Sequence, residues 1–161
     1  MRLPATLLSA LALLTACATT PPPQSRDLYV MRHLLKAEGQ DPPLSALGQA
    51  CATALARTLF DRGIRTIYVS TTARSRQTAG PLAARLGLTP VEYDPRDTPA
   101  LTARVRAEAG TTLVVGHSNT VPDIVEGLGG PRPGDLDETR YGEIWRMAAN
   151  GTVTMMRIEG C

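Results

Sequence analysis

Residues 112–128 read Thr-Leu-Val-Val-Gly-His-Ser-Asn-Thr-Val-Pro-Asp-Ile-Val-Glu-Gly-Leu, and they contain the clearest strand of the chain. Residues 112–115 are β-branched or apolar, as in a buried strand, and residues 121–128 place apolar side chains at helical spacing. Similar runs occur upstream, with strands expected at 28–31, 64–70 and 91–93, and helices at 45–62, 73–86 and 99–109. This alternation predicts an α/β domain, a three-layer αβα sandwich around a mostly parallel sheet.

The C-terminal part of the sequence follows a different pattern. Two strand-like runs, 143–147 and 152–158, flank Asn150-Gly151, a dipeptide typical of tight hairpin turns. The sheet is therefore expected to end in an antiparallel hairpin. The one long loop expected in the domain, residues 129–140, precedes this hairpin.

The composition excludes one class of partner. The 161 residues carry 17 basic and 15 acidic side chains, a net charge of +2, with one Phe, one Trp and four Tyr. A nucleic-acid-binding surface needs a basic stripe or a set of stacking aromatic side chains, so no nucleic-acid partner is expected. Only two histidines are present, His33 and His117, so any histidine chemistry must use these two.

The N-terminal region is expected to lie outside the folded domain. Residues 1–16 have the basic start and short apolar run of a secretory signal; a buried N-terminal helix is the alternative. Leu14-Thr15-Ala16-Cys17 resembles the lipobox of bacterial lipoproteins, which implies lipidation of Cys17; an ordinary cleaved signal is the alternative. Residues 17–26 contain three consecutive prolines and are expected to form a tether, with the domain at 27–161.

The lipobox resemblance also implies a location. A lipid-anchored domain of this kind is exported to the periplasm and attached to a membrane through Cys17. Because Ala18 and not an aspartate follows Cys17, the lipoprotein pattern implies the outer membrane.

The other two cysteines, Cys51 and Cys161, allow two interpretations. Cys51 lies on the apolar face of the expected helix 45–62, with Leu47, Leu55 and Leu59, which favours a buried free cysteine. A Cys51–Cys161 disulfide is the alternative that an oxidising compartment permits. No cysteine and histidine share a usual ligand spacing, so no metal site is expected.

Basic and imidazole side chains follow three expected strands at the point where each ends. Arg32-His33 follows the first strand, Arg74 the second, and Gly116-His117-Ser118-Asn119 the strand at 112–115. Ligands of open α/β sheets bind beyond the carboxyl ends of the strands. Two guanidinium groups and two imidazoles there suit a phosphoryl group, because arginine binds phosphate oxygens bidentately and imidazole is a nucleophile. Taken singly, these side chains also fit a half-buried histidine, surface arginines and a helix cap.

Four motifs resemble the histidine phosphatase superfamily, also called phosphoglycerate mutase-like. Val30-Met31-Arg32-His33 is similar to its Arg-His-Gly motif, and Leu44-Ser45-x-x-Gly48 to its Leu-Thr-x-x-Gly motif. Residues 70–79, Ser-Thr-Thr-Ala-Arg-Ser-Arg-Gln-Thr-Ala, are similar to its Ser-Ser-x-x-Arg-x-x-Gln-Thr-Ala segment. Val114-Val115-Gly116-His117 is similar to its second-histidine strand end. The motifs occur in the order of the family and span most of the domain.

The resemblance implies a catalytic set that needs no metal or other cofactor. His33 is the expected nucleophile, and Gln77 in the third motif selects Arg74, not Arg76, as the second phosphate-binding arginine. The residues expected to bind the phosphorylated group are Arg32, Arg74, His117, Ser118 and Asn119. The family's substrate specificity comes from variable loops, here residues 36–43, 93–99 and 129–141.

Departures from the family pattern limit these expectations. Leu34 replaces the small third residue of the first motif and is expected to narrow the pocket floor. Ser118 replaces the aspartate of the acid phosphatase branch, and the mutase branch needs an insertion for which this chain has little room. Asp97, or alternatively Asp94, is the expected general acid, although a turn and helix cap fits both equally well.

The resulting prediction is a phosphatase that hydrolyses a small phosphomonoester through a phosphohistidine. The alternatives are a phosphohistidine protein phosphatase and a catalytically weak protein that binds a phosphorylated ligand. The sequence predicts neither the individual substrate nor the oligomeric state.

Overall fold

The computed structural model describes residues 26–161, so the expected signal peptide, Cys17 and nearly all of the tether lie outside the described residues. The elements in chain order are β1 (Leu28–Arg32), α1 (Ala46–Leu59), the short 3₁₀ turn η1 (Phe60–Arg62), β2 (Ile64–Ser70), α2 (Ala73–Leu86), β3 (Val91–Tyr93), α3 (Thr98–Ala107), β4 (Thr111–Gly116), α4 (Val121–Gly127), β5 (Glu143–Met147) and β6 (Val153–Arg157). Within residues 26–161, no helix is both long and apolar enough to cross a membrane.

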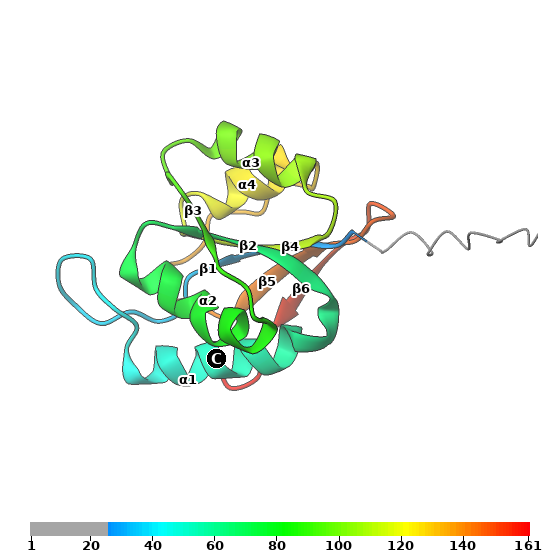
Figure 1. The fold of residues 1–161 in the computed structure, drawn as a ribbon. Helices are drawn as coiled ribbons and strands as arrows, with labels where there is room; N and C mark the ends of the chain where they lie inside the picture. The colour runs from blue at the N-terminus through cyan, green and yellow to red at the C-terminus, as the bar shows by residue number, and fades with distance from the viewer. Residues whose placement is uncertain (1–25) are drawn as a thin grey trace, which may run out of the picture.

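The six strands form one mixed sheet in the order β3-β2-β4-β1-β5-β6. The pairs β2–β3, β2–β4 and β1–β4 are parallel, whereas β1–β5 and β5–β6 are antiparallel. Figure 1 shows α1 and α2 on one face of the sheet and α3 and α4 on the other. The predicted three-layer αβα sandwich with an antiparallel C-terminal hairpin is confirmed.

The strand period of two builds a separate core on each face of the sheet. In β1, Tyr29 and Met31 pack toward α1 and α2, while Val30 between them packs toward α3 and α4. The central strand β4 is buried along its whole length, and Val114 joins the second core. Because both faces are covered, the middle strands present continuous apolar runs and not an alternating pattern.

The start of α1 explains one of the family-like motifs. The Ser45 hydroxyl accepts a hydrogen bond from the amide of Gly48, which satisfies a free N–H of the first turn. A Cβ added to Gly48 would lie 2.0 Å from the carbonyl oxygen of Leu35. Glycine is thus required where α1 meets the chain that leaves β1.

The expected element boundaries shift slightly in the structure. The helix expected at 45–62 is regular only to Leu59 and ends in the 3₁₀ turn before Gly63. The helix expected at 99–109 begins one residue earlier, at Thr98, and already ends at Ala107. The reason is Glu108, whose carboxylate accepts hydrogen bonds from the hydroxyls of Thr66 at 3.0 Å and Tyr68 at 2.7 Å on β2.

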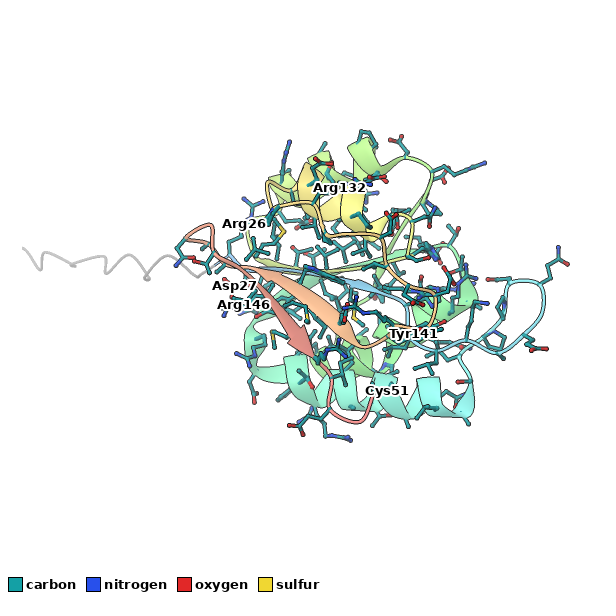
Figure 2. All side chains as sticks on the ribbon, turned by 180° about the vertical axis from the view of Figure 1, so that it is seen from behind. Arg26, Asp27, Cys51, Arg132, Tyr141 and Arg146 are labelled. Carbon is teal, nitrogen blue, oxygen red and sulfur yellow. A yellow bond between two sulfur atoms is a disulfide. The ribbon has the colours of Figure 1, made fainter. Side chains whose placement is uncertain are left out.

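The favoured interpretation of Cys51, a buried free cysteine, is wrong. Cys51 forms a disulfide with Cys161, with the two Cα atoms 5.8 Å apart, and is itself 1% exposed. The helical period correctly places Cys51 on the buried face of α1 (Figure 2). It carries no information about the segment after β6, which returns along α1 and brings Cys161 into contact.

Candidate active site

The two histidines meet because β1 and β4 are adjacent parallel strands. Arg32 of β1 pairs in register with Gly116 of β4, and the amide of His33 donates to the Gly116 carbonyl at 2.9 Å. His33 and His117 therefore leave the same edge of the sheet side by side. Their ring centroids are 5.3 Å apart, with the planes inclined by 65°.

The hydrogen bond of the His33 ring determines which nitrogen can react. Nδ1 lies 2.8 Å from the carbonyl oxygen of Leu34, which can only accept, so Nδ1–H is the donor. In the neutral ring Nε2 then carries the free lone pair. Burial lowers the pKa of His33 to about 3, and the charges of Arg32 and Arg74 act in the same direction. At neutral pH His33 is an uncharged imidazole with an available Nε2.

Leu34 does not narrow the pocket floor as expected. Its side chain is fully buried in the core shared with α1 and α2, and its amide donates to the Thr78 hydroxyl at 2.9 Å. The period of two along the extended chain turns Leu34 away from the side that His33 faces.

His117 is held by a chain of hydroxyl groups. Its Nδ1 lies 3.5 Å from the Arg74 guanidinium, which only donates, so Nδ1 faces it as an acceptor. Nε2–H then donates to the Ser70 hydroxyl at 2.8 Å, and Ser70 donates onward to Ser75. Burial, together with the charges of Arg74 and Arg32, lowers the pKa of His117 to about 4.

The two expected arginines lie at the site, but their surroundings differ. Arg32 is 3% exposed, donates to the Asp137 carbonyl at 3.0 Å and stacks 4.2 Å above the ring of Tyr141. Arg74, in the first turn of α2, is 3.6 Å from the carboxylate of Asp41. Arg76 faces away and pairs with Glu92 on the surface. The structure thus brings Arg74 and not Arg76 to the histidines.

Both arginines keep an unused donor. Among residues 26–161, the buried Nε–H groups of Arg32 and Arg74 have no hydrogen-bond partner. Buried donors without a partner are costly and rare. The side chains of both arginines, the two histidines and residues 118–120 before α4 line one cavity.

This cavity has a volume of about 320 Å³ and is cationic at its rim. It is lined by Arg32, His33, Lys36, Thr72, Arg74, Pro95, Arg96, His117, Ser118, Asn119, Thr120 and Glu138. The expected binding residues Ser118 and Asn119 therefore lie at the site. No group of three or more potential metal ligands occurs among residues 26–161.

Asp97, the expected general acid, is not part of this cavity. Its carboxylate accepts a hydrogen bond from the Ala100 amide at 3.0 Å and caps α3. The alternative acid, Asp94, pairs with Arg96, which lowers its pKa to about 2. Both carboxylates are engaged within their own loop, as the helix-cap alternative anticipated.

Sequence analysis did not identify the carboxylate and the aromatic ring that do lie at the site. Glu138 pairs with Arg32 at 2.8 Å. The ring of Tyr141, which is labelled in Figure 2, lies 6.2 Å from the ring of His33. Both come from the long loop before β5, which was expected only to influence specificity. The available signal was topological: a hairpin strand added beside β1 would bring its preceding loop to Arg32.

Comparisons with known proteins point to one family. Residues 30–97 match the model of the histidine phosphatase superfamily, branch 1. No curated protein matches the sequence. The fold resembles the protein histidine phosphatase SixA complexed with tungstate, with 20% identity and a TM-score of 0.59 over 81% of this chain and 94% of that one.

Two further solved structures have the same fold. A mycobacterial glucosyl-3-phosphoglycerate phosphatase has 15% identity and a TM-score of 0.63, covering 83% of this chain and 97% of that one. A protein of Agrobacterium tumefaciens, provisionally assigned as a phosphohistidine phosphatase SixA, has 21% identity and a TM-score of 0.65, covering 81% and 97%. The family match supports the expected enzyme class, a phosphatase, and the solved structures support the fold.

Proposed function

We propose that the chain is a member of the histidine phosphatase superfamily and that it hydrolyses a phosphomonoester through a phosphorylated His33, because residues 30–97 match the model of that superfamily and the fold agrees with it. One observation carries the proposal. A buried, uncharged imidazole with a free Nε2 lines the same cavity as the side chains of two arginines, Arg32 and Arg74. This arrangement suits a nucleophile next to an anion-binding site.

In the first step, Nε2 of His33 attacks phosphorus and forms the P–N bond, while the bond from phosphorus to the leaving oxygen breaks. The Leu34 carbonyl accepts the hydrogen bond from Nδ1–H and stabilises the positive charge that the imidazole ring acquires. The guanidinium groups of Arg32 and Arg74 neutralise the phosphoryl oxygens as charge redistributes.

His117 changes its protonation when the phosphoryl group arrives. The dianion raises the pKa of His117, because a nearby negative charge favours the protonated ring. Nδ1, which faces Arg74 in this structure, then gains a proton and donates to a phosphoryl oxygen. In the second step water attacks phosphorus and the P–N bond breaks. His33 returns to its neutral form, and inorganic phosphate is released.

The substrate is a small phosphorylated molecule. The volume of the cavity, about 320 Å³, suits a phosphoryl group with a short leaving group. Similar folds have been solved with tungstate and with inorganic phosphate, which are a phosphate analogue and a reaction product. The likeness to SixA makes a phosphohistidine protein substrate the second candidate.

The test uses residues 27–161 of the chain with p-nitrophenyl phosphate, a panel of sugar phosphates and a phosphohistidine peptide. We expect turnover and a labelled protein after denaturation in alkali, in which phosphohistidine survives. Label and turnover should both disappear in His33→Ala. Tight binding of phosphate without turnover of any substrate would instead favour a binding protein.

We also propose export and lipid attachment through Cys17, which lies outside the described residues. The Cys51–Cys161 disulfide supports this, because disulfides persist in oxidising compartments such as the periplasm. Expressed in a Gram-negative host, the full chain should fractionate with outer membranes, and Cys17→Ser should release it. A Cys17→Ser variant that stays in the membrane fraction would contradict the anchor.

A further inference from the structure

The carboxylate of Glu138 accepts hydrogen bonds from two side chains, Arg32 and Ser118, that are expected to bind the phosphoryl group. One oxygen accepts from Arg32 at 2.8 Å, and the other accepts from the hydroxyl of Ser118. The Glu138 side chain is 71% exposed, whereas that of Arg32 is 4% exposed. A buried cation is therefore covered by a carboxylate that can leave without disturbing the core.

The other nearby carboxylates do not line the cavity and have partners of their own elsewhere. Asp97 caps α3, and Asp94 pairs with Arg96. Asp41 accepts from the Ala73 amide at 3.0 Å and so caps the start of α2. Asp137 accepts from the amide and hydroxyl of Thr139 within its own turn. Within residues 26–161, Glu138 is the one carboxylate that lines the cavity with His33 and His117.

We infer that Glu138 is the general acid and base of the reaction, and that its pairing with Arg32 is the resting position it occupies without substrate. This inference rests on the proposed phosphatase function. It assigns the proton transfer to the loop between α4 and β5, and not to the loop after β3 where the sequence suggested it.

Substrate binding itself would prepare the carboxyl group. Without substrate, the Ser118 hydroxyl and the positive charge of Arg32 hold the pKa of Glu138 below its usual range, and Lys36 acts in the same direction. An incoming phosphate dianion competes for Arg32 and places negative charge beside Glu138. Both changes raise the pKa of Glu138 and favour the protonated acid.

The proton balance closes over two steps. As His33 Nε2 forms the P–N bond, the leaving oxygen takes its electron pair from phosphorus and a proton from Glu138, which becomes a carboxylate. Water then attacks phosphorus and gives a proton to the Glu138 carboxylate, while the electron pair of the P–N bond returns to Nε2. The products are an alcohol and hydrogen phosphate, and both side chains are restored.

The test compares wild type with Glu138→Gln, using p-nitrophenyl phosphate and glycerol phosphate. p-Nitrophenolate leaves without a proton, whereas an alkoxide does not. First-turnover phosphorylation by p-nitrophenyl phosphate should stay within about threefold, while phosphorylation by glycerol phosphate should fall about 100-fold or more. Because water is no longer activated, Glu138→Gln should also accumulate phosphohistidine, and the alkaline limb of its pH profile should disappear.

Glu92→Gln is the matched control. Glu92 is also exposed and pairs with an arginine, Arg76, at 3.0 Å, but it lies outside the cavity. Its first-turnover rates should match wild type with both substrates.

Two results would overturn the assignment of Glu138. Equal losses or no loss with the two substrates would show that Glu138 transfers no proton to the leaving group. Faster reaction and tighter phosphate binding in Glu138→Gln would show a carboxylate that only competes with the ligand. Failure of the proposed function looks different: wild type itself would show neither turnover nor a labelled His33.

Discussion

The site at the carboxyl ends of the parallel strands and the C-terminal corner of the domain are built by opposite means. At the site, His33 and His117 are buried and held uncharged, and the Nε–H groups of Arg32 and Arg74 have no partner among residues 26–161. We define the corner as Cys51, Gly142, Glu143, Arg157 and Cys161. There, both cysteines and both charged side chains have a partner. The disulfide joins Cys51 to Cys161, and buried Glu143 accepts from Arg157 at 2.6 Å.

The difference shows where the fold accepts a cost and where it gains stability. Unpaired donors and uncharged buried histidines destabilise the folded chain, but the uncharged ring keeps Nε2 of His33 free. The corner stabilises the loop that reaches this site. Gly142, with φ of 77°, separates Tyr141 on Arg32 from Glu143, and a Cβ there would lie 3.1 Å from Cβ of Cys161.

The largest effect is expected at the corner. Replacing Cys51 and Cys161 by alanine should lower the free energy of unfolding by about 4–5 kcal/mol, because the disulfide closes a loop of 110 residues. Urea unfolding of wild type and variant measures the difference. A reducing agent should lower the stability of wild type and leave the variant unchanged. Equal stability of the two proteins would show that the disulfide at the corner does not stabilise the fold.

A loss of activity without a comparable loss of stability is expected at the site. Arg74→Met should lower kcat/KM about 100- to 1000-fold, because it removes a donor to the developing phosphoryl charge. Arg76→Met is the control two residues along the same helix, and its kcat/KM should stay within about twofold. Similar losses in both variants would show that the anion site has been assigned to the wrong arginine.

The arrangement of the sheet and the meeting of the histidines could be predicted because both follow from local periodicity. The apolar runs of β1, β2 and β4 identify buried strands, and parallel strands place their carboxyl ends at one edge. His33, His117 and Arg74 each follow such an end directly or open the next helix. Their convergence therefore needed only the strand order, which the alternation of strands and helices already restricts.

The disulfide and Glu138 depend on long-range packing, which periodicity does not describe. Cys161 is 110 positions from Cys51, and Glu138 is 106 positions from Arg32. Asp97 was a plausible acid because it follows β3, but an aspartate just before a helix finds a nearer partner in the backbone amide of the first turn. Asp97 therefore caps α3 and does not line the cavity.

The cost of keeping the site histidines uncharged should appear as a pH dependence of stability. Their pKa values, about 3 for His33 and about 4 for His117, lie below the ordinary 6.5, so below pH 6.5 the unfolded chain takes up protons that the folded chain does not. The free energy of unfolding should therefore fall as pH drops, by about 2–3 kcal/mol between pH 6 and pH 5.

Denaturant titrations at pH 5, 6 and 7 measure this dependence. His33→Asn removes one of the two titrating groups and should halve the slope, whereas the corner variant Cys51→Ala/Cys161→Ala should keep the full slope at lower stability. A His33→Asn curve parallel to that of wild type would mean that the folded site binds protons as readily as the unfolded chain.

The smallest effects are expected at Asp97, which belongs to neither region. Asp97→Ala should lower the free energy of unfolding by about 1 kcal/mol, because it removes the cap of α3. Asp97→Asn should change stability little, since asparagine caps a helix as well as aspartate does. Asparagine cannot act as a general acid, so activity with glycerol phosphate distinguishes the two roles of this position. Unchanged activity in both variants would leave Asp97 with a structural role only; a large loss in Asp97→Asn would return the proton donor to the loop after β3.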